Sequence, residues 1–376
     1  MTLALVHDWL NQVGGAEDVL ATLVGLYPAS PVYTSIYAPD LMPASYRAWD
    51  IRPLWLDRLP AIHSHHQPYL PLYPLAWGGL DLSRHEVILS NKSGFCHGVR
   101  HGSQTIHICY CLAPTRYVWQ LDAYVAREGL GALAQAGLRP LMAALRRWDY
   151  AAAQRVTHFI AISTEIRQRI ARYYGRESVI IYPPVDTARF QPSATVEDYF
   201  LVVSRLIPYK RIDLAVQAAT RLGVPLKVAG RGRDLEQLRA LAGPTVEFLG
   251  YVPDDALPDL MARCKAFIFP GLEDFGITPV QAQAAGRPVI AYGGGGALDT
   301  VLPGVTGEHF TQPTVEALMA VMAGFDAGRY RPARLRAHAE RFDSGVFSAQ
   351  ITSFVEQAQA VFQQQRPFVW HNPVQL

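Results

Sequence analysis

The fold is decided by residues 266–296, AFIFPGLEDFGITPVQAQAAGRPVIAYGGGG, in which two short apolar runs flank a turn and a helical segment. The runs Ala266–Phe269 and Val289–Tyr292 have the length and character of buried strands. Thr278 suits the N-cap of the intervening helix, Pro279 its first position, and Gly286 its end. Strand, helix and strand in this order predict parallel strands whose sheet is covered by helices on both faces.

The same alternation continues outward through the rest of the chain. Short apolar runs predict further strands at Leu3–Val6, Val32–Ile36, Val87–Ser90, Thr105–Cys111, His158–Ile162, Val179–Tyr182, Phe200–Ser204, Leu226–Ala229 and Val246–Leu249. Residues 39–82, rich in Pro, Tyr, Trp and His, predict loops and short helices. Prolines and small polar residues in 182–199 predict a hinge. The sequence therefore predicts an α/β fold with two parallel-sheet domains, 1–185 and 186–345.

Composition narrows the class of protein. The chain has 376 residues, of which half are hydrophobic, and a net charge of +2. This balance disfavours long disordered tracts and a nucleic-acid partner. Four cysteines are too few for a disulfide framework, and no apolar run approaches the ~20 residues of a membrane-spanning helix. We therefore expect a soluble protein of the cytoplasm.

Turns that follow strands should carry the chemistry, since ligands bind at the carboxyl ends of parallel strands. After the strand at 200–204 come Arg205 and Lys210, which could cradle a diphosphate at the start of a helix. A solvated basic loop is the alternative. A cation in the first helical turn opposes the helix dipole, and an anionic ligand would explain its presence there.

Three further turns are candidate ligand sites. Glu273 could accept bonds from sugar hydroxyls while Phe275, Gly276 and Ile277 offer backbone N–H groups, although helix capping would also account for an acidic residue here. The loop 293–296, four glycines, can fold around a ligand or simply be flexible. Gly14 and Gly15 open the first helix, where free N–H groups attract anions; the alternative is a tight turn.

Together these motifs resemble family 4 retaining glycosyltransferases of GT-B fold, most closely bacterial mannosyltransferases that build O-antigen and exopolysaccharides. The resemblance covers nearly the whole chain and is most specific in SRLIPYK and EDFGITPVQAQAAGRPVIAYGGGG. It implies an N-terminal domain that binds acceptor, a C-terminal domain that binds a nucleotide sugar, and a C-terminal helix within 346–376 that returns to the first domain.

The resemblance also implies roles for individual residues. Arg205 and Lys210 match the pair that neutralises the donor diphosphate, and Gly14 and Gly15 match the loop that packs against it. Glu273 matches the carboxylate that holds the donor sugar. The matching backbone donors to this sugar are Phe275, Gly276 and Ile277. In this family the departing phosphate accepts the acceptor's proton, so the resemblance implies neither metal nor cofactor.

Two positions depart from the family pattern. Gln281 stands where a second Glu is expected; it could bind the ribose hydroxyls, or cap its helix through the pattern Thr278-x-x-Gln281. Leu112 replaces a His that contacts the donor sugar in many relatives. The remaining polar candidates for the acceptor side of the cleft are Arg116, Asn91 and Lys92.

Other clusters are weaker candidates. Neither His63, His65 and His66 nor His107, Cys109 and Cys111 has a convincing ligand set for a metal, so we expect none. The sequence predicts a helix over 130–155, whose basic part, 138–155, could contact an anionic membrane or be an ordinary surface helix.

The sequence thus predicts a hexosyltransferase that uses GDP-mannose and a glycan or lipid-linked acceptor, with a peripheral membrane contact as a further expectation. The alternatives are a transferase with another nucleotide sugar, and a non-catalytic nucleotide-sugar-binding partner of another transferase.

Overall fold

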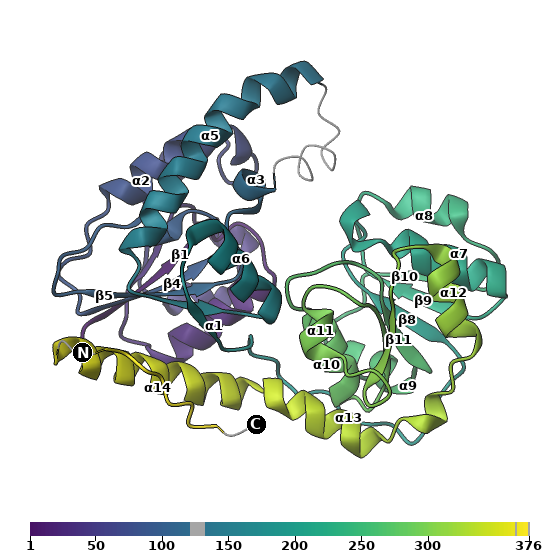
Figure 1. Ribbon diagram of the computed structural model, residues 1–376. Coiled ribbons are helices and arrows are strands. Elements are labelled where there is room, and N and C mark those ends of the chain that lie inside the picture. Colours follow the sequence, from purple (N-terminus) through teal and green to yellow (C-terminus); the bar gives the residue numbers. More distant parts are fainter. Residues whose placement is uncertain (121–131, 365–366, 375–376) are drawn as a thin grey trace. The chain divides into compact units, whose positions relative to one another are not determined.

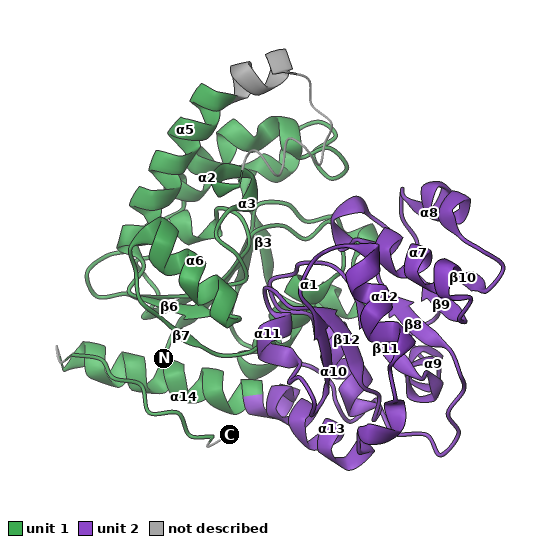
Figure 2. Ribbon diagram, turned by 45° about the vertical axis from the view of Figure 1, so that its right-hand side comes forward, with its two compact units in different colours: residues 1–184, 347–375 green, residues 185–346, 376 purple. Residues whose placement is uncertain are grey.

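A computed structural model describes residues 1–120, 132–364 and 367–374, which form two compact units (Figures 1 and 2). Unit 1 comprises Met1–Pro184 and Phe347–Gln375, and unit 2 comprises Val185–Val346. Each unit is an α/β domain with its own sheet and core.

Unit 1 contains a seven-stranded parallel sheet in the order β3-β2-β1-β4-β5-β6-β7. The central strands are fully buried because apolar side chains extend from both of their faces. The strands are β1 (Leu3–His7), β2 (Val32–Thr34), β3 (Ile51–Pro53), β4 (Val87–Lys92), β5 (Ile106–Cys111), β6 (His158–Ala161) and β7 (Ser178–Ile180).

Helices cover this sheet, and one core cluster joins residues of β1 and β4 to Trp77, Phe95 and Leu145. The described α-helices are α1 (Gly15–Leu26), α2 (Tyr73–Gly79), α3 (Arg116–Trp119), α5 (Ala132–Arg155), α6 (Thr164–Tyr174) and α14 (Ser344–Gln363). Helix α14 begins in unit 2 and buries Phe347, Ile351 and Phe354. The C-terminal helix expected within 346–376 thus ends at Gln363, and the described residues 367–374 beyond it are irregular.

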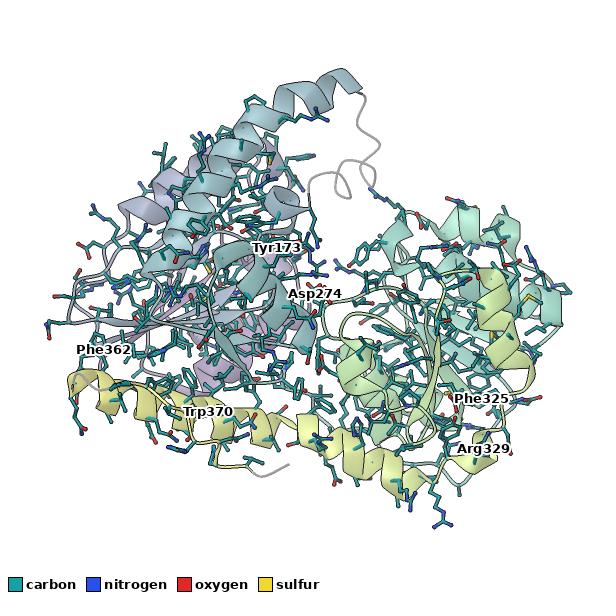
Figure 3. All side chains as sticks on the ribbon, in the orientation of Figure 1. Tyr173, Asp274, Phe325, Arg329, Phe362 and Trp370 are labelled. Atoms are coloured by element: carbon teal, nitrogen blue, oxygen red, sulfur yellow. The ribbon has the colours of Figure 1, made fainter. Side chains whose placement is uncertain are left out.

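Unit 2 contains a six-stranded parallel sheet in the order β10-β9-β8-β11-β12-β13. Its core includes Phe200, Val228, Ile268 and Phe310. Phe325, labelled in Figure 3, packs against Phe200. The strands are β8 (Phe200–Val203), β9 (Leu226–Ala229), β10 (Val246–Gly250), β11 (Ala266–Phe269), β12 (Val289–Tyr292) and β13 (Gly307–Phe310).

Helices of unit 2 follow the strands in the expected alternation. Helix α7 lays one face on the sheet through Ile212, Ala215, Val216 and Ala219. The α-helices are α7 (Ile212–Leu222), α8 (Leu235–Leu241), α9 (Leu257–Arg263), α10 (Ile277–Ala284), α11 (Ala297–Thr300), α12 (Val315–Ala323) and α13 (Pro332–Ala339).

Two edge strands were missed by the sequence prediction. Strand β3 lies in the stretch interpreted as loops and short helices, and contains Pro53, which only an edge strand tolerates. Strand β13, GEHF, has only one strongly apolar residue and is half-buried at its centre. Among the residues that the structure describes, none of the helices combines the length and apolar character that crossing a bilayer requires.

Candidate active site

The strand order of unit 2 reverses between β8 and β11, and the loops that leave these two strands carry the main candidate residues. Ligands of parallel α/β sheets bind outside the carboxyl ends of strands at such a reversal. Arg205 and Lys210 follow β8, and Glu273 follows β11. The topology therefore brings together two motifs that lie more than sixty residues apart in the sequence.

Lys210 and Glu273 form an ion pair between Nζ and Oε2, with side chains that are 14% and 19% exposed. Gly271 permits this approach, because a Cβ there would lie 2.9 Å from the carbonyl oxygen of Lys210. Arg205 is exposed and forms no ion pair with another described residue. The site thus presents a cation for an anionic group and a carboxylate for hydroxyl groups at adjacent positions.

The expected location of Lys210 in the first turn of an α-helix is wrong. Lys210 ends a 3-10 turn, Pro208–Lys210, and α7 begins only at Ile212. Between them Arg211 adopts a left-handed backbone conformation with φ of 53°, and its guanidinium makes two 3.1 Å hydrogen bonds to Asp213. This kink separates Lys210 from the helix, so the dipole of α7 does not oppose its charge directly.

The N-terminus of α10 faces the end of β11 through Gly276, whose φ of 99° requires glycine. A Cβ at Gly276 would also lie 2.8 Å from Cζ of Phe269. The helix begins at Ile277, so the expectation that Thr278 is the N-cap is wrong. The backbone N–H groups of Gly276 and Ile277 have no acceptor among the described residues, and can donate to a ligand.

The glycine loop 293–296 supports the segment that carries Glu273. The Gly296 N–H donates to the carbonyl oxygen of Glu273 at 2.8 Å. A Cβ on Gly295 or Gly296 would overlap the backbone of Glu273 or Phe275. Asp274, which is next to Glu273 and is labelled in Figure 3, is buried. Gly295 and Gly296 therefore cannot be replaced by larger residues without displacing the acidic loop, which packs on their backbone.

Gln281 lies on α10, half-buried, and its side chain makes no hydrogen bond to another described residue. The capping-box alternative for Gln281 is wrong, because α10 begins too early for Thr278 to be its N-cap.

In unit 1 the strand order reverses between β1 and β4, beside the Gly14–Gly15 turn. Gly14 is the N-cap of α1, with an extended backbone. A buried network holds this helix start: Asn91 Nδ2 donates to Ala16 O at 2.7 Å and to His7 Nδ1 at 3.2 Å, and His7 Nε2 lies 3.4 Å from Glu17 Oε1. Since His7 Nδ1 accepts, its Nε2 carries the proton toward Glu17.

Asn91 and Lys92 were expected to line the acceptor side, but the structure buries both completely. Lys92 Nζ donates to Ala113 O at 3.0 Å and to Thr115 Oγ1 at 3.3 Å. Burial alone would lower the pKa of Lys92, but the nearby charge of Asp149 and other groups raise this pKa above its ordinary value. Lys92 is buried because it is the last residue of a strand that is buried on both faces. It therefore serves the interior of unit 1 and not the acceptor side.

Arg116 and Leu112 lie in the segment that leaves β5. Arg116 is exposed at the start of α3, and Leu112 is half-buried before it. Thr115, between them, is fixed by a 2.8 Å bond to Asp149, which also accepts from Trp119 and Tyr174. Of the three acceptor-side candidates, only Arg116 is presented on the surface.

Two structural features near these loops were not singled out from the sequence. Gly230 and Gly232, after β9, lie so close to Ser204 and Leu206 that a Cβ would overlap their backbone. The signal was a Gly-x-Gly pattern directly after a predicted strand. Asp8, after β1, accepts N–H bonds from Ser93, Gly94, Phe95 and Cys96 and closes the turn after β4. A buried aspartate at a strand end leaves no distinct sequence pattern.

The weaker clusters have ordinary partners. His63 bonds to Asp57 at 2.8 Å, and buried His107 bonds to Ser90 at 2.9 Å. Within the described residues no group of three His, Cys, Asp or Glu side chains is placed to hold a metal. Two arginines of helix α5 donate hydrogen bonds to backbone carbonyl oxygens. Arg146 donates to Val118 O at 2.8 Å, and Arg155 donates to Gly98 O at 3.0 Å. The first two residues of the expected helix, 130–131, lie outside the described residues.

Solved structures share this architecture along almost the whole chain. Anabaena Alr3699/HepE in complex with UDP matches with a TM-score of 0.70 at 18% identity, covering 95% of this chain and all of that one. Sucrose-phosphate synthase from Thermosynechococcus elongatus matches with a TM-score of 0.70 at 17% identity and the same coverage. The fold is therefore GT-B, which confirms the expectation from the sequence.

Within this fold class, residues 186–341 match the model of the family described as Glycosyl transferases group 1. The matched part of the chain contains Arg205, Lys210, Glu273 and Gln281, and the match agrees with the resemblance recognised in the sequence.

Curated relatives agree with the family. The chain is 33% identical over 178 residues to a GDP-mannose-dependent alpha-(1-6)-phosphatidylinositol monomannoside mannosyltransferase of Mycobacterium tuberculosis, covering 39% of this chain and 46% of the relative. The Mycolicibacterium smegmatis protein of the same name is 31% identical over 206 residues, covering 46% and 54%. The chain thus spans about half the length of the curated relatives it matches.

Proposed function

We propose that the protein is a retaining glycosyltransferase that moves mannose from GDP-mannose to a glycan or lipid-linked acceptor. The observation that carries this proposal is the Lys210–Glu273 pair at the strand reversal of a Glycosyl transferases group 1 domain. A cation and a carboxylate in contact match a ligand that joins a phosphate directly to a polyhydroxylated ring. A nucleotide sugar has this arrangement.

The site residues divide between the two parts of the donor. Lys210 and Arg205 bind the diphosphate, Arg205 through its planar fork and Lys210 as a point charge. Glu273 and the N–H groups of Phe275, Gly276 and Ile277 hold the hexose, and Gln281 meets the ribose. From the first domain, Gly14 and Gly15 pack against the diphosphate. The departing phosphate accepts the acceptor's proton, so the reaction needs neither an enzymatic nucleophile nor a metal.

GDP-mannose is the proposed donor because the curated relatives with the highest similarity reported above are named GDP-mannose-dependent. Their names also make phosphatidylinositol monomannoside the first acceptor to test. Arg116 on the surface of unit 1 is the proposed contact for such an anionic acceptor. We place the reaction in the cytoplasm, with the exposed Arg139 and Arg147 of α5 near the inner face of the membrane.

The test combines binding and turnover. Thermal-shift measurements with GDP-mannose, GDP, UDP-glucose and UDP should show the largest stabilisation with the guanosine ligands, because ligand binding stabilises by mass action. Purified protein should hydrolyse GDP-mannose slowly and transfer mannose to the lipid acceptor, and Glu273→Ala should stop both. Stabilisation by UDP ligands alone would overturn the donor assignment. Donor binding without hydrolysis or transfer would favour a non-catalytic nucleotide-sugar-binding partner.

A further inference from the structure

A pocket of about 450 Å³ lies in unit 1, away from the strand ends that carry the candidate active site. Its walls include Thr157 and His158 at the start of β6, and Glu177 and Ser178 at the start of β7. The candidate residues of unit 1 all lie at or beyond the carboxyl ends of β1, β4 and β5. Because all strands of this sheet are parallel, the pocket lies at their amino-terminal ends, opposite the ends that carry the candidate residues. Its size is that of a small-molecule site.

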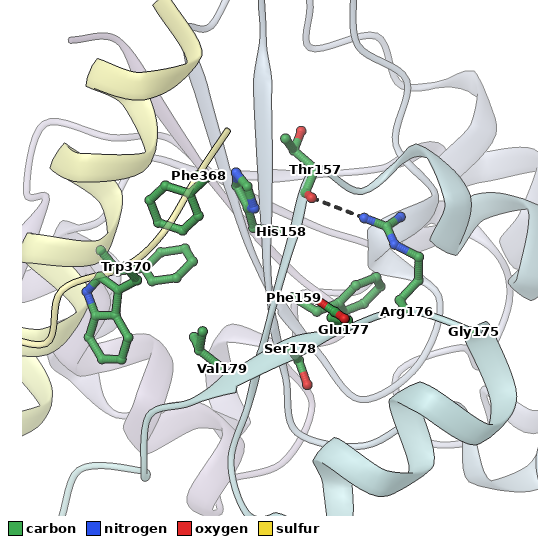
Figure 4. Close-up of a pocket in the computed structure, with 11 residues that line it drawn as sticks. Thr157, His158, Phe159, Gly175, Arg176, Glu177, Ser178, Val179, Phe368 and Trp370 are labelled. Carbon is green, nitrogen blue, oxygen red and sulfur yellow. Dashed lines mark hydrogen bonds between the residues drawn. The ribbon is translucent and has the colours of Figure 1, made fainter. Parts of the chain in front are cut away.

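Aromatic rings form one wall of the pocket. The ring of Phe368 lies 4.5 Å from His158 and 5.1 Å from Phe354, and Trp370 lies 5.6 Å from Phe354, measured between centroids. Figure 4 shows Phe368 against His158, with Trp370 on the same side of the pocket. This wall thus combines helix α14 with the irregular residues that follow it.

The segment carrying Phe368 and Trp370 is anchored to α14. Gln357 Nε2 donates to His371 O at 2.9 Å, and the His371 N–H donates to Gln357 Oε1 at 3.0 Å. Gln350 Nε2 donates to Asn372 Oδ1 at 3.2 Å. The two hydrogen bonds between Gln357 and the backbone of His371 fix the chain next to Trp370. The aromatic wall is therefore held in place by the fold.

Several polar groups of the pocket lack partners. Ser178 Oγ and Trp370 Nε1 are buried atoms without a hydrogen bond among the described residues. Neither the His158 imidazole nor the Glu177 carboxylate forms a hydrogen bond or ion pair with another described side chain. Burial lowers the pKa of His158 to about 4, with Arg176 adding to the effect, so this ring is neutral near pH 7 and offers one donor and one acceptor.

The charges of the pocket select against an anion. Arg176 directs its guanidinium to the carbonyl oxygens of Ala153 at 2.9 Å and Thr157 at 3.1 Å, the latter visible in Figure 4. Glu177 is exposed and negative. A phosphate would therefore be repelled by Glu177, and Arg176 would not compensate because its guanidinium already bonds to backbone carbonyl oxygens. An acyl chain would bury the His158 imidazole and the Glu177 carboxylate at a cost.

We propose that this pocket binds a neutral hexopyranose unit of a glycan, at a site separate from the candidate active site. The C–H face of the ring stacks on Trp370 and Phe368, and its hydroxyls bond to Glu177 and His158. The site would hold an acceptor or product chain while its end is extended elsewhere. The role of the site toward an acceptor or product chain and the choice of mannose as the probe sugar both rest on the proposed function.

The experiment measures binding of α-1,6-linked mannotriose to the full chain by isothermal titration, with saturation-transfer NMR on the same samples. Wild type should bind weakly but measurably. Trp370→Ala should weaken this binding about tenfold, the scale of a lost aromatic contact. Glu177→Gln should weaken it about fivefold through loss of a charged acceptor. Because Glu177 is exposed, its variant stays informative even if Trp370→Ala fails to fold.

Two variants are matched controls. Trp55→Ala removes an exposed tryptophan of unit 1 outside the pocket, and Lys210→Ala alters the candidate donor site; both should bind mannotriose as wild type does. No binding to wild type, or equal affinity in wild type, Trp370→Ala and Glu177→Gln, would overturn the proposal. Loss of binding in Lys210→Ala alone would also overturn it, by assigning the sugar to unit 2. GDP titrated into the same proteins tests the proposed function separately.

Discussion

Lysines occur at the strand reversals of both sheets, but the two units use them differently. Lys92 is the last residue of β4 and is fully buried, with Thr115 and the charge of Asp149 beside it. Lys210 lies in a turn beyond the end of β8, remains 14% exposed, and pairs with Glu273. A lysine inside a buried strand becomes part of the core, whereas one carried by a loop remains accessible to a ligand.

The largest expected effect tests the buried lysine. Lys92→Met should destabilise the protein by about 3–5 kcal/mol, because it leaves Asp149 as a buried charge without its cation. Lys210→Met, the matched control, should destabilise the protein less, because its partner Glu273 is 19% exposed and stays partly hydrated, whereas Asp149 is fully buried. Urea unfolding of both variants measures the contrast. Equal losses would remove the distinction between the two lysines.

The second prediction concerns the carboxylate partner in unit 2. Glu273→Ala should lower transfer by about 100-fold or more, the scale of losing a group that stabilises a transition state. GDP affinity should stay near the wild-type value, because this side chain meets the hexose and not the nucleotide. Steady-state kinetics and GDP titration supply the two numbers. A strong loss of GDP affinity would mean instead that Glu273 serves to orient Lys210.

The third prediction separates the two cations of the site. Lys210→Ala should lose about 1.5–3 kcal/mol of GDP binding, the scale of a bond to a charged group. Arg205→Ala should lose less, because Arg205 is exposed and must be ordered by the ligand. Titration at matched salt gives both values. If neither variant weakens GDP binding, the diphosphate lies elsewhere.

The fourth prediction uses acid to compare the units. Burial holds the pKa of His97 and His107 in unit 1 well below the ordinary value, and lowers the pKa of His338 in unit 2 to about 4. These groups bind protons more readily when unfolded, so their contribution to stability is full above about pH 6.5 and is lost as pH falls toward 4. Calorimetry between pH 7.5 and 5 should show unit 1 losing more stability.

His107→Gln provides the control for this titration. The substitution removes a titrating group but retains a side chain able to bond Ser90, the partner of His107. It should lower stability at pH 7.5 and flatten its pH dependence. An unchanged slope would show that His107 does not drive the acid sensitivity of unit 1.

The fold was largely predictable from the sequence, and the site only in part. Apolar runs located the buried strands, and the specific motifs led to Arg205, Lys210 and Glu273. The same reasoning could not tell that Lys92 points inward, because strand periodicity does not fix which polar residue finds a buried partner. It also placed Lys210 in a helix, since nothing in the sequence announces the left-handed conformation of Arg211.

The smallest expected effect tests the position at which this chain departs from its family. A carboxylate that accepts two ribose hydroxyls makes stronger bonds than an amide, so Gln281→Glu should tighten GDP binding by about 1 kcal/mol, a gain of several-fold. The fold should tolerate the change, because Gln281 is half-buried and its side chain makes no hydrogen bond to another described residue. Repulsion from the diphosphate would offset part of the gain, with Arg205 and Lys210 screening it. Titration of both proteins with GDP at matched salt decides the matter. Since Thr278 is not the N-cap, helix capping no longer accounts for Gln281, and equal affinities would show that the ribose lies away from this side chain.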